Sequence, residues 1–538
     1  MLGLMQHHPL LIGSVIDHAA RTFGEVEIVS RTIEGPITRS TYRDVALRSR
    51  KLAQALIRLG IEPGDRVGGA SWNHDRYLEA FYGVSGFGAV LHTTNPRLFP
   101  EQLAYTISHA GDKAMLVDLG TIEALEAIAG DLPDVKTYIV LTDTANMPET
   151  SLPNALAYED LLAGEDGDYE WPEFDERTAS AICYTSGTTG DPKGIVYSHR
   201  STVLHALANA APNAGNYSHR DTIMPVVPLF HGNGWGMPFV APLTGAKLVL
   251  PGRAMEMAAL LELIVDESVT IGIGVPTIWL SMLEHLKTAG GGLGEMKRIL
   301  TGGSAPPPAL IEMLEREHGV ETVHAWGMTE TQAASTFAMP AAGLPAKDAM
   351  AARTAQGRPL FGHEIRLTGP DGETLPADAV GDLKARGHWV ASAYYRRDDA
   401  PALDDEGWLI TGDVATINDK RELRLTDRAK DVIKSGGEWI SSIDLENAAV
   451  GHPDIAEAAV IGVPHPRWQE RPVLIVVRGE GGRVEAEALI AWLADHVAKW
   501  WLPEEVLFVD EIPHTGTGKI DKVRLRRRYA ELKGEAAE

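Results

Sequence analysis

The segment YTSGTTGDPKG, residues Tyr184–Gly194, is the strongest local signal in the sequence. It holds three glycines, four Ser or Thr hydroxyls and Lys193 within eleven residues. Glycine lets backbone N–H groups turn toward an anion, and hydroxyls and a lysine add further donors and charge. A short apolar run, Ile182–Tyr184, precedes the segment and is expected to be a strand. The composition of this loop is typical of a triphosphate-binding site.

Two common nucleotide-binding motifs are excluded for this loop. A P-loop needs GxxxxGK followed by Ser or Thr, whereas Gly187 and Gly190 are three residues apart and Gly194 follows Lys193. No GxGxxG dinucleotide fingerprint follows a predicted strand either. For the loop alone, a flexible Gly/Ser/Thr surface turn is the alternative interpretation.

The chain around this loop has the composition of a globular enzyme. It has 538 residues, of which 44% are apolar and 23% are charged, and this excludes a disordered, collagen-like or coiled-coil protein. Lys and Arg number 49 and Asp and Glu 74, so the net charge is −25. Like charges repel, so nucleic acid and anionic membranes are not expected partners, although a local basic pocket for a small anion is allowed.

The single cysteine, Cys183, excludes an internal disulfide framework and a CxxC zinc site. It agrees with a reducing compartment, and we expect a cytoplasmic protein. The N-terminal residues lack the basic start and continuous apolar stretch of a signal peptide. No run of about 18 apolar residues occurs, so no membrane span is expected.

Helix and strand patterns alternate over most of the chain. For example, Pro100 is placed to open a helix that Gly111 ends, and residues 114–117 form the next strand. This rhythm predicts an α/β fold with a large N-terminal domain of βα-rich sheets covered by helices. The Ala- and Pro-rich stretch 333–356 is expected to be a surface loop. Apolar runs at 456–463 and 473–477, a helix at about 485–498 and a strand at 505–509 predict a small α+β C-terminal domain.

Further motifs follow the loop in a fixed order, and together they resemble those of the adenylate-forming superfamily. That superfamily includes acyl-CoA and aryl-CoA synthetases, peptide-synthetase adenylation domains and beetle luciferases. The resemblance covers about residues 184–522 and implies two domains. Residues 1–427 would hold the ATP and acyl sites, and residues 428–538 would form a mobile lid. Beyond Tyr184–Gly194, the motifs are Pro228–Trp235, Gly302–Pro308, Ala325–Glu330, Gly381–Gly387, Gly407–Val414, Asp427–Ser441 and Pro513–Lys522.

The resemblance implies a reaction in two steps. ATP and a carboxylic acid give an acyl-adenylate and pyrophosphate, and a thiol then displaces AMP. Thr185 and Glu330 are the expected ligands of Mg²⁺, which prefers oxygen. The residues implied to bind ATP or AMP are Thr185, Ser186, Gly187, Thr188, Thr189, Gly190, Lys193, Gly302, Gly303, Ser304, Ala305, His324, Ala325, Trp326, Gly327, Met328, Thr329, Asp413, Arg428 and Lys519.

Lys519 is the principal catalytic candidate. The matching lysine of the superfamily bridges the substrate carboxylate and the α-phosphate as charge builds in the transition state. Glu330, through the metal ion, and His231 are the other catalytic candidates. Lys430 matches the hinge about which the lid turns between the two steps. The resemblance then places Lys434, Gly436, Gly437, Glu438 and Trp439 along the tunnel for the pantetheine arm of CoA.

The acyl pocket is expected to involve His231, Trp235, Gly302 and Gly327. Acetyl-CoA synthetases have a Trp where this chain has Gly327, so the acyl group should exceed acetyl, and Trp235 is a candidate wall limiting its length. The alternative interpretation of His231 is a purely structural role. The PLFHGNGW segment lacks the aspartate that peptide-type domains use for an amino acid, and the chain has 19 residues after Lys519, which favours free CoA as the acceptor.

The resemblance is strongest to bacterial short- and medium-chain acyl-CoA ligases, a group that includes 3-methylmercaptopropionate–CoA ligases. An alkanoate and a thioether acid of that length are nearly isosteric, and the sequence leaves both open. An aryl-CoA ligase or a luciferase-like adenylating enzyme is the alternative. A homodimer is expected from similar enzymes. Pro513–Lys519 fits the PxxxxGK pattern of ligases silenced by lysine acetylation, so an acetyltransferase and a deacetylase acting on Lys519 are possible partners.

Overall fold

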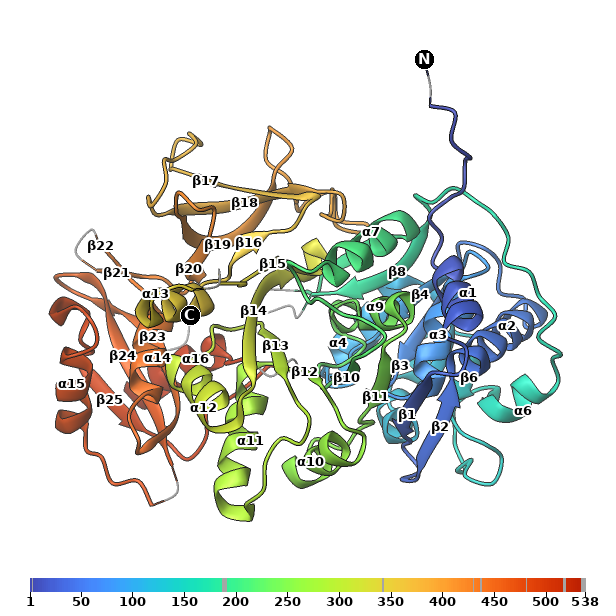
Figure 1. The fold of residues 1–538 in the computed structure, drawn as a ribbon, viewed down its shortest axis with the longest axis horizontal. Helices are drawn as coiled ribbons and strands as arrows, with labels where there is room; N and C mark the ends of the chain where they lie inside the picture. The colour runs from blue at the N-terminus through green and yellow to red at the C-terminus, as the bar shows by residue number, and fades with distance from the viewer. Residues whose placement is uncertain are drawn as a thin grey trace.

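The computed structural model describes residues 1, 3–185, 191–340, 343–428, 430–435, 438–479, 481–515 and 519–533. The chain forms a large N-terminal unit with three sheets and a smaller C-terminal unit with one. Figure 1 places the C-terminal strands β23–β25 at one end of the long axis and β1–β6 toward the other. The predicted mixed α/β architecture with a large and a small domain is confirmed.

The first sheet carries the phosphate-loop candidate. Its order is β7-β6-β5-β3-β4-β8-β9, and all neighbours are parallel except β8 and β9. The expected helix is α4, with Pro100 at its first turn and Gly111 in the left-handed conformation at its end. The strands are β3 (Arg66–Ala70), β4 (Val90–Thr93), β5 (Asp112–Val117), β6 (Thr137–Val140), β7 (Ala155–Ala157), β8 (Ala179–Tyr184) and β9 (Gly194–Ser198).

The second sheet supplies much of the cavity described below. Its order is β16-β15-β14-β13-β12-β10-β11-β1-β2, parallel from β14 to β1 and antiparallel at both edges. The strands are β1 (Glu27–Arg31), β2 (Ile37–Thr41), β10 (Thr222–Pro225), β11 (Lys247–Leu250), β12 (Ile271–Ile273), β13 (Arg298–Gly302), β14 (Glu321–Met328), β15 (Ala333–Phe337) and β16 (Arg358–Pro359).

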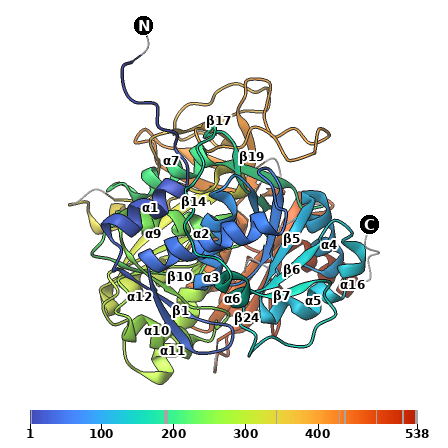
Figure 2. The same cartoon turned by 90° about the vertical axis from the view of Figure 1, so that its right-hand side faces the viewer.

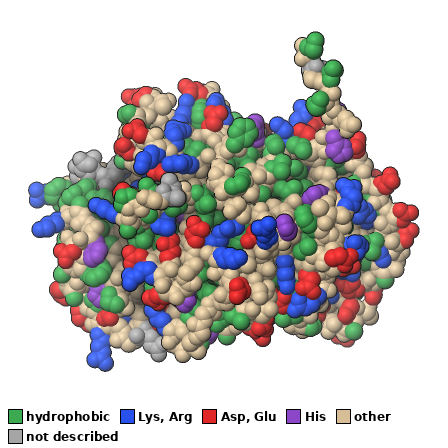
Figure 3. Space-filling model, viewed as in Figure 1, with side chains coloured by type: hydrophobic (Ala, Val, Ile, Leu, Met, Phe, Trp, Pro, Cys, Tyr) green, Lys and Arg blue, Asp and Glu red, His purple; other side chains and the backbone are tan. Residues whose placement is uncertain are grey.

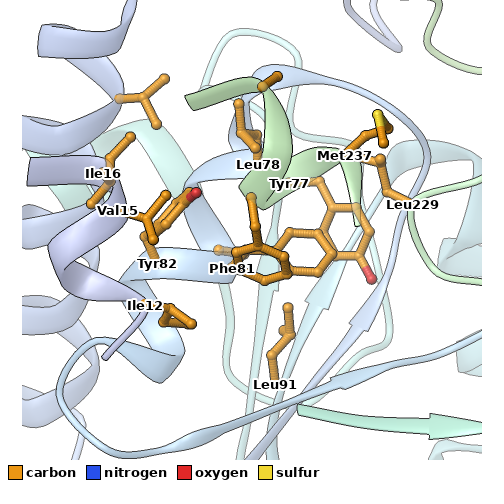
Figure 4. Close-up of a cluster of buried hydrophobic side chains, with 14 of the residues drawn as sticks. Ile12, Val15, Ile16, Tyr77, Leu78, Phe81, Tyr82, Leu91, Leu229 and Met237 are labelled. Atoms are coloured by element: carbon orange, nitrogen blue, oxygen red, sulfur yellow. The ribbon is translucent and has the colours of Figure 1, made fainter. Parts of the chain in front are cut away.

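Helices between these two sheets form the largest hydrophobic core. Figure 4 shows Val15 and Ile16 beside Tyr82, with Phe81 and Leu91 close by. The phenol of Tyr82 donates to the carbonyl of Pro238, so this core also fixes the helix that follows the acyl-pocket candidates. The helices of this layer are α1 (Gly13–Thr22), α2 (Tyr42–Arg58), α3 (Asp75–Ser85), α6 (Tyr158–Ala163), α7 (His199–Ala210), α8 (Gly232–Trp235) and α9 (Met237–Thr244).

Two further groups of helices cover the outer faces of the sheets. One packs on Met115, Val117 and Tyr138 of the first sheet, and the other on Val29, Met224 and Ile299 of the second. Figure 2 shows the first group beside β5–β7. The helices are α4 (Pro100–Ala110) and α5 (Ile122–Glu126) in the first group, and α10 (Met257–Asp266), α11 (Pro276–Ala289) and α12 (Pro308–His318) in the second.

The stretch 333–356 differs from its prediction as a surface loop. Its start is β15, a fully buried strand that pairs with β14, and its second half contains α13 (Ala346–Thr354). The backbone of β15 passes very close to Gly327, where an added Cβ would lie 1.4 Å from the Ala333 carbonyl oxygen. A third, antiparallel sheet of β17 (His363–Thr368), β18 (Gly381–Gly387), β19 (Leu409–Ile417) and β20 (Leu423–Arg428) follows.

The C-terminal unit is a sheet with helices on it. The predicted strands and helix of this region are confirmed, with the helix ending at Ala494. Its elements are β21 (Ile433–Ser435), β22 (Glu438–Ile440), α14 (Ser442–Val450), β23 (Ile455–His465), β24 (Gln469–Arg478), α15 (Ala486–Ala494), β25 (Glu505–Phe508) and α16 (Lys522–Lys533).

Acidic and basic side chains are intermixed on the face shown in Figure 3. No helix in the described part of the chain has both the length and the apolar character that a membrane crossing requires.

Candidate active site

The loop 184–194 joins two antiparallel strands, since Tyr184 at the end of β8 pairs with Gly194 at the start of β9. Thr185 N donates to the Lys193 carbonyl at 2.9 Å, and Lys193 N donates to Thr185 Oγ1 at 3.1 Å. Lys193 Nζ lies 4.4 Å from the centre of the Tyr394 ring. The other predicted phosphate-binding residues, Ser186, Gly187, Thr188, Thr189 and Gly190, lie outside the described residues.

A cavity of about 600 Å³ lies beside this loop, between the large unit and Lys519 of the small one. A volume of this size fits a nucleotide with a small acyl group. The structure brings most of the described candidates from several motifs to its wall. They are Thr185, Lys193, His231, Trp235, Gly302, Gly303, Ala325, Trp326, Gly327, Met328, Thr329, Glu330, Arg428 and Lys519.

Glu330 contributes a buried carboxylate to the cavity wall. It follows β14 in a short 3-10 helix, Thr329–Thr331, and its side chain is 7% exposed. The Tyr394 hydroxyl donates to Glu330 Oε1 at 3.0 Å. Burial raises the pKa of this carboxyl, and a cation bound beside it would favour its charged form. Glu330 and Thr185 both offer hard oxygen donors, which suits Mg²⁺.

Asp413 links two other motifs behind the cavity wall. Its Oδ2 accepts from Trp326 Nε1 at 2.9 Å, and its Oδ1 lies 2.8 Å from Arg428 Nε. Asp413 is 2% exposed and does not itself line the cavity, whereas Trp326 and Arg428 do. The buried carboxylate therefore holds a planar indole and a guanidinium in place at the same wall.

Lys519 reaches the cavity from the small unit. A Cβ added to Gly303 would lie 3.4 Å from Lys519 Cε, so the lysine stem passes over the glycine turn that ends β13. Burial, with the positive charge of Arg428, lowers the pKa of Lys519 to about 8. Such a lysine is only partly protonated near that pH and becomes fully charged when an anion binds beside it.

His231 and Trp235 also line the cavity. They lie at the two ends of the left-handed backbone stretch through Asn233 and Gly234. The end of the Trp235 ring lies 3.4 Å from the position of a Cβ on Gly302, so the indole covers that turn. Burial, with the charge of Lys519, lowers the pKa of His231 to about 4, which keeps its imidazole neutral at pH 7.

Gly327 lines the cavity where β14 and β15 approach most closely. A Cβ at Gly327 would lie 1.4 Å from the Ala333 carbonyl oxygen, and the strand register shifts between Trp326 and Gly327. The close backbone approach alone therefore excludes a side chain there. Glycine at position 327 is therefore explained by the close strand approach as well as by the expected depth of the acyl pocket.

Other candidates lie away from the cavity wall. Ser304 and Ala305 follow Gly303 in the turn before α12. His324 is buried in β14, and burial lowers the pKa of its imidazole to about 4. Lys430 and Lys434 lie outside the cavity, and Lys434 is exposed on β21. Gly436 and Gly437, together with the side chains of Glu438 and Trp439, lie outside the described residues.

Several cavity residues were not expected from the sequence. Asp191 belongs to the quoted loop, and Thr411 and Gly412 to the GWLITGDV segment, so proximity to a motif could have suggested them. Tyr394, Arg397 and Asp399 stand in a polar stretch without a recognisable pattern. They reach the cavity because Tyr395 N donates to the Gly194 carbonyl, which ties this stretch to β9.

Sequence profiles and known proteins match this chain. Residues 16–395 match the sequence profile of AMP-binding enzymes, and residues 444–519 match that of the AMP-binding enzyme C-terminal domain. A 3-methylmercaptopropionyl-CoA ligase of Ruegeria lacuscaerulensis is 46% identical over 534 residues, which cover 98% of this chain and 99% of the relative. A medium-chain-fatty-acid–CoA ligase of Ectopseudomonas oleovorans is 46% identical over 537 residues, 99% of this chain and 98% of the relative.

Among solved structures, an anthranilate CoA ligase in complex with anthranoyl-AMP has the same fold. Its TM-score is 0.88 at 23% identity, over 98% of this chain and 99% of that one. The profile matches and the two full-length relatives show that this chain belongs to the family of AMP-binding enzymes.

Proposed function

We propose that the protein is an AMP-forming acid–thiol ligase. It activates a short- or medium-chain carboxylic acid with ATP as an acyl-adenylate, releases pyrophosphate, and transfers the acyl group to CoA. The observation that carries the proposal is the convergence of Lys519, Arg428 and Glu330 on one cavity beside the Thr185–Lys193 loop. A lysine, an arginine and a carboxylate for a metal ion are the groups that a triphosphate and an attacking carboxylate require.

The first step needs positive charge where the carboxylate approaches the α-phosphate. Two anions meet there, and negative charge moves onto the bridging oxygen of the leaving pyrophosphate. Lys519 donates to the approaching carboxylate and to an α-phosphate oxygen, and Lys193 donates to the outer phosphates. Arg428 holds the ribose, and its position is fixed by Asp413 at 2.8 Å. These contacts stabilise the transition state because the donors are already oriented.

We assign Mg²⁺ to Thr185 and Glu330, with ATP and CoA as co-substrates. The ion supplies charge neutralisation on the phosphates when it is bound. Among the described residues, no three His, Cys, Asp or Glu side chains gather as a metal site. The ion would therefore complete its shell with phosphate and water oxygens, as Mg²⁺ commonly does.

The acid is proposed to be an alkanoate of about four to eight carbons or a thioether acid of similar length, such as 3-methylmercaptopropionate. Val227, Trp235 and Ala334 are apolar residues of the cavity wall, and the neutral His231 adds no charge to it. Apolar wall residues bind short hydrocarbon or thioether chains by burial, and the bulk of the indole would limit the length of the chain.

The test is pyrophosphate release with ATP and Mg²⁺ across a panel of acids, each with and without CoA. The panel runs from acetate to decanoate and includes 3-methylmercaptopropionate, benzoate and amino acids. CoA-stimulated turnover that peaks between C4 and C8, or on the thioether acid, is expected. A peak on benzoate would favour the aryl-CoA ligase alternative. Turnover indifferent to CoA would favour a luciferase-like adenylating enzyme.

We also propose that the enzyme lies in the cytoplasm, where its buried free Cys183 stays reduced. We propose a homodimer, which sedimentation analysis would distinguish from a monomer.

Acetylation of Lys519 would remove its charge and silence the first step. Full activity of the protein acetylated at Lys519 would refute this proposal.

A further inference from the structure

A second, much smaller cavity shares two wall residues, Thr185 and His231, with the large one. Its volume of about 10 Å³ corresponds to one position for a water molecule. Most of its wall residues carry a polar side-chain atom, which is the setting in which a buried water is stable. The wall consists of His92, Thr93, Asn95, Leu98, Thr106, Tyr184, Thr185, Phe230 and His231.

His92 is the wall residue with an unmet hydrogen-bonding need. Its Nδ1 lies 2.7 Å from Asp112 Oδ2, and both side chains are fully buried. With Nδ1 donating to the carboxylate, a neutral imidazole accepts at Nε2. Within the described residues, His92 Nε2 has no hydrogen-bond partner. A buried acceptor without a partner lowers stability, so a donor in the adjacent cavity is favoured.

The fold places this pair at the base of the phosphate loop. His92 lies near the end of β4, which runs parallel to β8 with Thr93 opposite Cys183. The imidazole packs on the ring of Tyr184 at a centroid distance of 5.0 Å. The Tyr184 hydroxyl lies 2.7 Å from His109 Nδ1 on α4, so Tyr184 is held by both histidines. Thr185 follows directly in the chain.

We infer that one buried water joins His92 Nε2 to the Thr185 hydroxyl. Thr185 Oγ1 already accepts from Lys193 N at 3.1 Å, and its own O–H needs an acceptor. The water accepts that hydrogen and donates one of its own to His92. The remaining lone pair of Thr185, which also lines the large cavity, would then be left for the proposed Mg²⁺. Asp112 and His92 are thus positioning residues for Thr185, as hydrogen-bonded partners commonly are for metal ligands.

The water itself is tested by a high-resolution crystal structure, which does not depend on the proposed function. Density for a water about 2.7–3.2 Å from His92 Nε2 and from Thr185 Oγ1 is expected in the wild type. It should be lost in His92→Phe, which keeps a planar ring but removes the acceptor. An empty cavity in the wild type, or water that persists unchanged in His92→Phe, would overturn the inference.

The consequence for ATP rests on the proposed function and is tested by kinetics. His92→Asn keeps a donor toward Asp112 and removes the Nε2 acceptor, whereas His92→Gln keeps a polar atom near that position. His92→Asn should raise the KM for ATP about 10-fold with kcat nearly unchanged, since the contact exists in the ground state. His92→Gln should recover most of that loss. In a Thr185→Val background, His92→Asn should add no further effect.

A merely structural role would give a different result. It would lower the melting temperature and kcat without a selective change in the KM for ATP, and that outcome would overturn the positioning role. His199→Asn is the matched control, because His199 is also fully buried but lines neither cavity and accepts from Ile12 N at 3.3 Å. It should lower stability and leave the KM for ATP unchanged. If the wild type showed no ligase activity, the proposed function would fail while the crystallographic result still decided on the water.

Discussion

At the scale of single residues, the chemistry depends on the charge of Lys519. Burial beside Arg428 lowers its pKa to about 8 in the free enzyme. The amine is therefore a cation below that pH and loses its proton as the pH rises through it. Because the proposed transition state needs the cation, kcat/KM for ATP should be sustained below about pH 8 and fall above it.

The pH dependence of the first step tests this assignment. The kcat/KM for ATP in pyrophosphate release should fall about tenfold per pH unit above pH 8, since this parameter reports groups of the free enzyme. Lys519→Arg should be slower at every pH but should lack this alkaline decline, because guanidinium stays charged. An unchanged decline in Lys519→Arg would assign the titration to another group.

Asp413 should act mainly on nucleotide binding. Asp413→Asn removes the charge that holds Arg428 at 2.8 Å while keeping an acceptor for Trp326. We expect the KM for ATP to rise about 10-fold or more, because charge-assisted hydrogen bonds are the stronger ones. Steady-state kinetics check this. Asp382→Asn, an exposed change on neighbouring β18, should have no such effect.

Trp235 should set the length of the acid. Trp235→Ala removes the indole that covers Gly302 and enlarges the cavity. The optimum in the acid panel should move toward longer chains, with kcat/KM for decanoate rising about 10-fold or more. An optimum that stays in place, with all acids equally impaired, would show that Trp235 supports the fold rather than limiting the pocket.

At the scale of elements, the pairing of β14 with β15 determines the shape of the cavity. Gly327 and Ala333 approach so closely that a Cβ would lie 1.4 Å from a carbonyl oxygen. Gly327→Ala must therefore push the strands apart, and we expect it to lower the melting temperature by about 5 °C and to reduce activity.

Gly130→Ala is the control for this change. A Cβ there would meet no atom within 4 Å, and the backbone is not left-handed. Thermal melts of both variants measure the difference. Equal stability of Gly327→Ala and Gly130→Ala would show that the two strands separate at little cost.

The helix α4 and the strand β15 show which elements the sequence could predict and which it could not. α4 could be predicted because Pro100 and Gly111 mark its ends by local backbone geometry. β15 could not, because its sequence AASTF has no apolar/polar alternation and alanine does not favour strands. Its conformation is imposed by pairing with β14, which is a long-range contact. Tyr394 likewise reaches the cavity only through the tertiary hydrogen bond of Tyr395 to Gly194.

At the scale of the whole molecule, the two units contribute unequally to the cavity. From the described part of the small unit beyond Arg428, Lys519 alone lines it, whereas Lys430 and Lys434 lie elsewhere. This arrangement suits the first step. We propose that the small unit turns about Lys430 for the second step, so that the segment from Lys434 to Trp439 replaces Lys519 at the site.

The most direct test of this account separates the two steps in Lys519→Ala. Adenylation is measured as pyrophosphate release from ATP and acid, and thioester formation as acyl-CoA made from supplied acyl-adenylate. We expect Lys519→Ala to lose adenylation by about 100-fold or more while thioester formation stays near the wild-type rate. Equal loss of both steps would contradict the alternation of the small unit, and unimpaired adenylation would contradict the role of Lys519.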